Sequence, residues 1–441
     1  MTRGFSPLDE ELALLPGALT PSLQEGLVRL GTWCPFAPAA AMLAYFTRVR
    51  VADATARRTT EAAGAAYVAV QTAQAEAIER DQPAAPPGPA LQYLSADGAM
   101  VSLVGQVWAE VKTLAVGTVG APVWEQGERV VHTTDLSYFS RMTDAATFTR
   151  LATVETQRRG TATAGQVAAV MDGAEWEQGF IDEQRPEAVR ILDCPHAVGY
   201  LAQAAQAGYG AGTVAATTWL ERQRHELRHG EPARVLDELR ALRAQVVSQT
   251  GDESAAATTI TTSLAYLEKR QAQIQYAAFA AAGYPIGSGA TESANKVVIE
   301  ARLKGAGMHW AAGHVSPMAA LRTIAASDRW EEAWPEISAQ RRRQARTQVA
   351  ARRQGRRATV AVASVLAAPP AAPVARLDLV LERPPGELGW RDSVPVVAMA
   401  PVLAGPAPAG PWRPAADHPW RGRRHRPQAA AIPPQPTSAE L

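Results

Sequence analysis

The sequence predicts a mixed α/β core that follows a helical segment and is interrupted by a helical insertion. Two apolar segments, 166–171 and 188–192, each end at an aspartate and are typical of buried strands. Strand signals also occupy residues 91–119, whereas residues 199–282 are helical in pattern almost throughout. A run of strands followed by alternating helices and strands favours a mixed sheet.

The first part of this core is predicted as a three-stranded meander. Residues 91–103 alternate apolar and polar around Asp97-Gly98, which indicates two strands joined by a tight turn. Residues 106–119 are expected to form the third strand, and residues 138–159 a helix. The two aspartate-ended segments then supply the fourth and fifth strands.

The segment before the core is helical in pattern. A break near residues 49–51 separates two predicted helices, and the second carries Arg57 and Arg58. This spacing suits a helix-turn-helix DNA-binding domain, and it equally suits a small helical bundle with surface arginines. The proline-rich stretch 81–90 is expected to be a linker, because proline disfavours helix.

Composition narrows the class of protein. The 441 residues have a net charge of +1, so contacts to nucleic acid depend on local patches such as residues 341–357, with eight arginines and no acid. Two cysteines, without CxxC spacing, argue against a zinc site or a disulfide framework. The absence of a secretion signal or a long apolar run predicts a cytoplasmic protein with no membrane contact.

Five segments are expected along the chain. They are a helical domain, the first part of the core, the insertion, the closing part of the core, and a basic then Ala/Pro-rich tail that is expected to be disordered. Their ranges are 1–82, 83–198, 199–283, 284–340 and 341–441.

Three acids have placements suited to chemistry. Asp97 and Asp172 follow apolar runs, and Glu292 lies in the first turn of the helix after the glycine-rich segment 285–289. Carboxylates that converge at a sheet edge suit Mg²⁺ or Mn²⁺ and two-metal phosphodiester chemistry. The alternatives are that each Asp-Gly pair is an ordinary turn, and that Glu292 only favours the positive end of the helix dipole.

Asp193 and His196 form a second cluster. Asp193 ends the fifth predicted strand, and His196 follows at the start of the next helix. The pair suits a metal site or a hydrogen-bonded pair that fixes the loop, and it also suits a helix N-cap beside a half-buried histidine.

Basic residues follow Glu292 along its helix. Lys296 is one turn further on the same face, and Arg302 and Lys304 come near the helix end. Basic side chains next to a metal-binding carboxylate suit contacts to a phosphate backbone, although a solvated helix face has the same pattern.

Taken together, these segments resemble the Kra-type bacterial insertion-sequence transposases, which are related to mutator-like transposases. The resemblance covers residues 15–335, and more weakly DHPWR near the end. The stretches that carry it are DLSYFSRMTDAATF, ETQRRG, VMDGAEW, RILDCPHAVGYL, GYPIGSGATESANKVVIEARLKGAGMHW and LRTIAASDRWEEAW.

The resemblance implies a ribonuclease H-like core with an Asp, Asp, Glu triad and a helical insertion before the Glu. The triad corresponds to Asp97, Asp172 and Glu292, and Asp193 is the rival for the second position. A Cys-or-Asp, two-residue, His motif of the family falls on Asp193 and His196, which are expected to support the site. The resemblance also implies Mg²⁺ or Mn²⁺, double-stranded DNA ends and target, and a homo-oligomer.

Several alternatives stay open. Trp176 and His196 are candidates for contacting a distorted nucleotide, with a core role favoured for Trp176. Relatives can carry a cysteine-rich zinc element near the N-terminus, and none is visible here. The rival functions are a decayed or repurposed DNA-binding protein without catalysis, and a metal-dependent nuclease unrelated to transposition.

Overall fold

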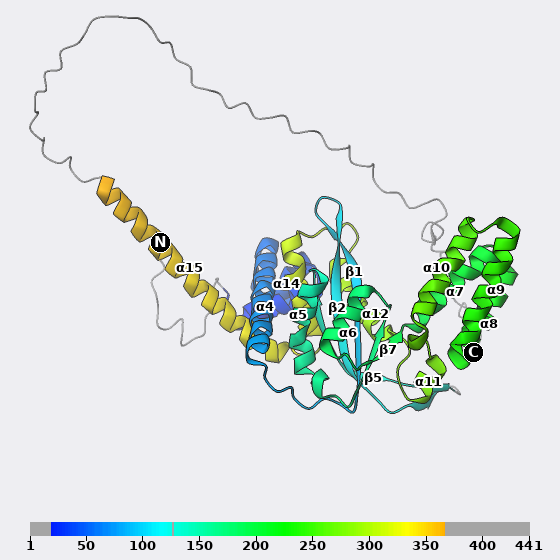
Figure 1. The fold of residues 1–441 in the computed structure, drawn as a ribbon. Coiled ribbons are helices and arrows are strands. Elements are labelled where there is room, and N and C mark those ends of the chain that lie inside the picture. The colour runs from blue at the N-terminus through cyan, green and yellow to red at the C-terminus, as the bar shows by residue number, and fades with distance from the viewer. Residues whose placement is uncertain (1–18, 126–127, 367–441) are drawn as a thin grey trace, which may run out of the picture. The chain divides into compact units, whose positions relative to one another are not determined.

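A five-stranded mixed sheet organises the computed structural model, which describes residues 19–125 and 128–366. The strand order is β5-β2-β1-β6-β7, with β1, β2 and β5 antiparallel and with β6 and β7 parallel to β1. The sheet lies between two groups of helices (Figure 1). The strands are β1 (Leu91–Leu103), β2 (Val107–Val119), β5 (Thr133–Arg141), β6 (Gln166–Met171) and β7 (Val189–Leu192), and a separate hairpin pairs β3 (Val123–Glu125) with β4 (Glu128–Val130).

The helices fall into two groups, one outside and one inside the insertion. Those outside it are α2 (Pro21–Trp33), α3 (Phe36–Thr47), α4 (Asp53–Asp81), α5 (Ala145–Arg158), α6 (Glu175–Gln184), α14 (Ala312–Ala326) and α15 (Trp330–Leu366). The insertion comprises α7 (Cys194–Tyr209), α8 (Val214–His229), α9 (Pro232–Thr250), α10 (Ala255–Lys269) and α11 (Tyr276–Ala281). The chain then returns through α12 (Gly289–Ala294), the π-helix η3 (Asn295–Glu300) and α13 (Ala301–Leu303). Short 3₁₀ turns η1 (Thr161–Thr163) and η2 (Gln271–Gln273) complete the described elements.

The prediction of a turn at Asp97-Gly98 is wrong. β1 runs without interruption through this pair, and the hairpin turn lies at residues 104–106, where Gly105 has a φ of 88°. A glycine at position 98 has another explanation, which is lack of space: a Cβ there would lie 2.1 Å from Oε1 of Glu110 on β2. An Asp-Gly pair is locally compatible with a turn, but pairing with Thr113 and Lys112 of β2 keeps it extended.

The predicted helix at 138–159 begins later than expected. Tyr138–Arg141 belong to β5, the third strand of the meander, and α5 begins after Asp144. The Asp144 carboxylate accepts a hydrogen bond of 2.9 Å from the Thr147 N–H and caps the helix. Tyr138 and Phe139 are buried on opposite faces of the sheet, which favours a strand here.

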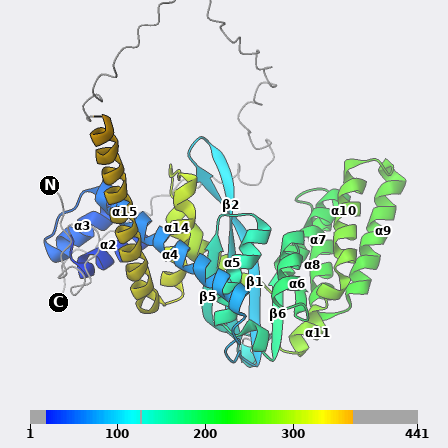
Figure 2. The ribbon, with the colours of Figure 1, turned by 60° about the vertical axis from the view of Figure 1, so that its left-hand side comes forward.

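The N-terminal helices belong to the same compact unit as the sheet. α4 packs along α14 and α15, as Figure 2 shows. Contact with α14 is close at Gly64, where a Cβ would lie 2.3 Å from the Pro317 carbonyl oxygen. Arg57 and Arg58 are exposed near the start of α4, which leaves them free of the core. Their predicted contact with DNA stays a prediction.

Residues 341–366, expected to start a disordered tail, are helical in the structure. They continue α15, and Arg341 is buried, donating a hydrogen bond of 2.9 Å to the Gln24 side chain of α2. The basic run therefore begins as part of the fold, because one face of α15 packs on the N-terminal helices. Residues 367–441, including the DHPWR segment, lie outside the described residues.

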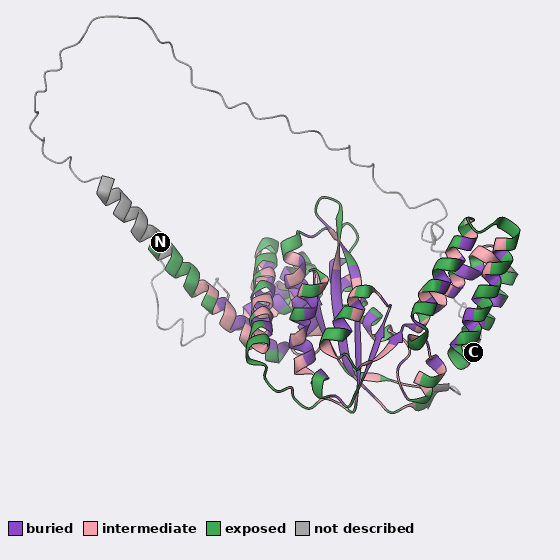
Figure 3. Ribbon diagram, in the orientation of Figure 1, coloured by how far each residue is buried: buried purple, intermediate pink, exposed green. Residues whose placement is uncertain are grey.

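Both faces of the sheet are buried (Figure 3). Alternation along β1 sends Tyr93 and Val101 to the face that packs on α12 and the insertion, and Leu94 and Ala96 to the face that packs on α5 and α6. None of the helices in the described ranges is both long enough and apolar enough to cross a membrane.

Candidate active site

Two aspartates lie near the ends of the two central parallel strands. The pairing of β1 with β6 sets Leu91 opposite Gln166 and Leu94 opposite Ala169. Asp97 lies three residues beyond the last of these pairs, and Asp172 directly follows β6. The charge of Asp172 raises the pKa of Asp97, so the two carboxylates lie close enough to interact.

The Asp97 carboxylate is half-buried and hydrogen-bonded on both oxygens. Oδ1 accepts from the Gly98 N–H at 2.6 Å, and Oδ2 accepts from Nδ2 of Asn295 at 2.8 Å. Burial raises the pKa of Asp97, and the negative charges of Asp172 and Glu292 raise it further, against the two hydrogen bonds, which lower it. The three predicted acids thus share one electrostatic environment, in which a cation would be stabilised.

A turn rich in backbone hydrogen bonds holds Asp172. Its Oδ1 accepts from the Ala174 N–H at 2.9 Å. Glu177, in the first turn of α6, is 1% exposed and accepts from the N–H groups of Gly173 and Ala174 at 3.0 and 3.2 Å. Burial raises the pKa of Glu177 to about 10, and a hydrogen bond to Asp172 and the charge of Asp172 contribute to the shift. Glu177 is therefore protonated at neutral pH and supports Asp172.

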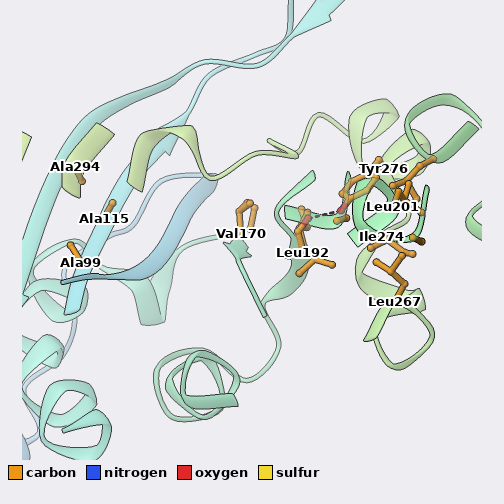
Figure 4. Packing of buried hydrophobic residues seen from close by; sticks show 14 of the residues in the cluster. Ala99, Ala115, Val170, Leu192, Leu201, Leu267, Ile274, Tyr276 and Ala294 are labelled. Carbon is orange, nitrogen blue, oxygen red and sulfur yellow. Dashed lines mark hydrogen bonds between the residues drawn. The ribbon is translucent and has the colours of Figure 1, made fainter. Parts of the chain in front are cut away.

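Glu292 is exposed on the short helix α12, which packs over β1 and β2. Small side chains let α12 approach the sheet: Figure 4 shows Ala294 beside Ala115 and Ala99. The Tyr93 and Thr291 hydroxyls, 3.3 Å apart, link β1 to the same helix. Across the described ranges, no three His, Cys, Asp or Glu side chains are already gathered closely enough to hold one metal ion. The acids nevertheless supply the hard oxygen ligands that Mg²⁺ and Mn²⁺ prefer.

Asp193 connects the sheet, the insertion and the glycine-rich loop. It is 4% exposed, and it caps α7 by accepting from the His196 N–H at 2.8 Å. Its other oxygen accepts from the Ser288 N–H at 2.6 Å, four residues before Glu292. Both carboxylate oxygens are thus committed to backbone donors. The structure places Asp193 in the N-cap position that was the alternative, and its supporting role at a metal site stays a prediction.

The insertion also holds the turn at Asp172 through hydrogen bonds. The Tyr266 hydroxyl of α10 donates to the Asp172 carbonyl, and the Arg270 guanidinium donates to the Gly173 carbonyl. The Tyr266 ring is stacked on Tyr200 of α7, with centroids 3.9 Å apart, and His196 lies beside both rings. His196 therefore packs against Tyr200 and Tyr266, the second of which holds the turn at Asp172.

The base of the insertion is fixed to the sheet by buried contacts (Figure 4). The Tyr276 hydroxyl donates to the Leu192 carbonyl at 2.8 Å, at the end of β7. Leu201, Leu267 and Ile274 pack around it and are fully buried. The end of the strand that leads to Asp193 is consequently rigid relative to α7 and α10.

Arg302 does not fit the predicted role of DNA contact. It is 2% exposed, its Nε donates to the Gly31 carbonyl at 3.1 Å, and its guanidinium lies over the rings of Phe36 and Trp310. A side chain turned into the core joins α13 to the N-terminal helices and does not reach a ligand at the surface. Lys296 and Lys304 are exposed, and Lys304 pairs with Glu300 at 2.8 Å.

Trp176 packs chiefly with the core. It is half-buried, its ring meets Phe148 edge-on at 5.7 Å, and the Lys112 ammonium lies 5.3 Å from its centroid. This matches the core role that the sequence favoured over contact with a nucleotide.

Three residues of the site were not found from the sequence: Glu177, Asn295 and Tyr266. Glu177 had a local signal, since an acid at the third position of a helix reaches back to the N–H groups before it. Asn295, one turn after Glu292, and Tyr266, in mid-insertion, carry no such signal, because their partners lie 198 and 94 residues away.

No protein-family model and no curated protein matches this chain. Function is therefore inferred from the residues and geometry of the site.

Proposed function

We propose that this protein is a DNA transposase with a ribonuclease H-like core, which cuts and joins DNA in a metal-dependent reaction at the ends of an insertion sequence. The observation that carries the proposal is the electrostatic interaction of Asp97 with both Asp172, which directly follows the neighbouring parallel strand, and Glu292. Converging carboxylates of this kind are what two-metal phosphodiester chemistry requires.

The topology supports the proposal. Three antiparallel strands, followed by two that are parallel to the first and lie on its other side, form the order expected of a ribonuclease H-like sheet. The helical insertion enters between the fifth strand and the helix that carries Glu292, as the sequence resemblance implies. The resemblance to Kra-type transposases then favours transposition over general nuclease activity.

Asp97, Asp172 and Glu292 are the residues that would hold Mg²⁺ or Mn²⁺. When bound, such an ion would polarise a scissile phosphate and offset the repulsion among the carboxylates. The chain's own groups orient these ligands: Asn295 holds one oxygen of Asp97, and the Ala174 N–H holds one oxygen of Asp172. These hydrogen bonds limit rotation of the carboxylates.

The surroundings of the triad suit a DNA backbone. Lys296, one turn after Glu292, is exposed and available to a phosphate. The partners proposed are double-stranded DNA at the element's ends, target DNA, and further copies of this chain, because two ends must be cut and joined together.

Cleavage of DNA that carries the element's own ends, with Mg²⁺, tests the proposal. The unmodified protein is compared with Asp97→Asn, Asp172→Asn and Asp193→Asn. We expect the first two variants to lose cleavage while they still bind the ends. Asp193→Asn should keep residual activity, since the asparagine oxygen can still cap α7.

Two results would contradict this assignment. Cleavage that persists in Asp172→Asn but is lost in Asp193→Asn, with both proteins folded, would move the second ligand to Asp193. Tight binding of the ends without cleavage by the unmodified protein would instead indicate a transposase-derived DNA-binding protein that has lost its activity.

A further inference from the structure

A surface groove lies between the insertion and the glycine-rich loop that leads to Glu292. Two hollows, of about 790 and 760 Å³, share the residues Arg228, His229, Ile286 and Gly287 and are therefore adjacent. We call it the α8 groove. One wall is α8, and the other is the glycine-rich loop that leads to Glu292.

The α8 wall is basic. Arg224, His225, Arg228 and His229 are exposed and recur at the spacing that places them on one side of a helix. Glu221, which pairs with Arg224 at 2.6 Å, is the single acid among the described residues that line the two hollows. Two arginines against one acid give the groove a net positive charge, which suits an anionic ligand.

An exposed aromatic ring stands in the same groove. Trp124, on β3, lines the larger hollow together with His132, and 76% of its surface is exposed. An indole left in solvent beside basic side chains is the combination that binds single-stranded nucleic acid, in which bases stack on rings and phosphates contact arginines.

The groove borders the helix that carries Glu292. Gly289, Ala290 and Ser293 of α12 line the larger hollow, although none of the three candidate acids does. The loop wall is held to the sheet, because Asp193 accepts from the Ser288 N–H and the Cys194 N–H donates to the Ile286 carbonyl at 3.0 Å. A strand in the groove would therefore run toward α12.

From these observations we infer that the α8 groove binds an unpaired DNA strand that runs toward α12, the helix of Glu292. This inference rests on the proposed function. The strand is unpaired because Trp124 can stack only on a base whose face is free, and base pairs in a duplex cover those faces.

Binding of a labelled single-stranded oligonucleotide, in EDTA and over a range of salt concentrations, tests the groove without catalysis. The double variant Arg224→Ala/Arg228→Ala removes two charges from the groove. Its matched control, Arg222→Ala/Arg234→Ala, removes two from exposed positions that pair with Glu238 and Glu226. Trp124→Ala removes the ring alone.

We expect the groove variant to bind at least tenfold more weakly than its control. Its slope of log affinity against log salt should fall by about 1.4, since each phosphate contact on a single strand contributes about 0.7. Trp124→Ala should weaken binding by about tenfold with an unchanged slope, because stacking releases no counterions. Binding to a blunt duplex should weaken less than binding to the single strand, both in the groove variant and in Trp124→Ala.

Equal binding by the groove variant and its control would overturn the inference, and so would equal losses on single-stranded and duplex DNA. If the unmodified protein still cleaves element ends in that case, the proposed function stands and only the groove assignment fails. If the unmodified protein binds neither kind of DNA, both proposals fail.

Discussion

The charge of Asp172 raises the pKa of Asp97, although 75 positions separate the two residues in the chain. On the other side of β6, Met171 pairs with Leu192, and the next residues are Asp172 and Asp193. The acids differ in the donors that they accept from. Asp193 accepts from two backbone N–H groups, whereas Asp97 accepts from one backbone N–H and from the Asn295 side-chain amide.

Replacing the buried carboxyl of Glu177 should change how stability depends on pH. Its pKa of about 10 in the folded chain lies above the ordinary 4.5. The stability it contributes is therefore complete below pH 4.5 and declines as the pH rises toward 10. Glu177→Gln keeps an acceptor for the Gly173 and Ala174 N–H groups and does not titrate, so its stability relative to the unmodified protein should increase from pH 6 to pH 9.

Urea unfolding at the two pH values measures this difference. Glu183→Gln, at an exposed position on the same helix, serves as the control and should show no such trend. A Glu177→Gln effect that is the same at both pH values would show that the carboxyl does not hold its proton in the folded state.

The hydrogen bond from the insertion to the Asp172 turn should matter for both stability and activity. Tyr266→Phe removes the donor to the Asp172 carbonyl and keeps the ring stacked on Tyr200. We expect a loss of about 1 kcal/mol in the free energy of unfolding, and slower cleavage because the turn gains freedom.

Tyr200→Phe is the matched control, since it alters the stacked partner and leaves the bond to Asp172 intact. Denaturant titration and single-turnover cleavage report the two effects. If the two variants behave alike, the Tyr266 hydroxyl has no special part in holding the turn.

Asn295 should set how tightly the site holds a divalent ion. Asn295→Ala removes the amide that donates to Oδ2 of Asp97 at 2.8 Å. Loss of a hydrogen bond that orients a metal-binding carboxylate typically costs about 10- to 100-fold in metal affinity or activity. The Mg²⁺ concentration for half-maximal cleavage should rise by about that factor.

Titration of cleavage with Mg²⁺ measures the change, and thermal unfolding in EDTA checks that the fold is kept. Ala301→Ser, at an exposed position on α13, should leave the Mg²⁺ requirement unaltered. An unchanged requirement in a folded Asn295→Ala protein would remove Asn295 from the site.

The thiol of Cys194 should react slowly with alkylating reagents. Burial raises its pKa to about 11, and the charge of Asp193 adds to the shift against Arg228 and Arg224, which lower it. At pH 8 its thiolate fraction should be about 100-fold smaller than that of a thiol with the ordinary value of 9.0. The alkylation rate should then rise about tenfold per pH unit up to pH 10.

Cys34→Ser leaves Cys194 as the single thiol of the chain, so mass spectrometry follows it alone. The same variant unfolded in urea gives the reference rate. A native rate at pH 8 equal to the unfolded one would show that the N-terminus of α7 does not bury this sulfur.

Some of the architecture follows from local sequence alone. β6 and β7 were predicted because short apolar runs bounded by polar residues identify buried parallel strands, and their last residues lead directly to Asp172 and Asp193. The helical pattern of the insertion was equally clear, since five helices repeat apolar residues at helical spacing. Glu292 was found from its place after a glycine-rich loop.

Other features depend on partners far away in the chain, and only the tertiary structure decided them. Asp97-Gly98 is extended because it pairs with Thr113 and Lys112 of β2, whereas its local sequence suits a turn. Arg302 is buried because the carbonyl of Gly31, 271 residues away, accepts its hydrogen bond. Local sequence determines which elements form and which acids end them. Long-range pairing and burial determine which of those acids meet and which basic residues remain at the surface.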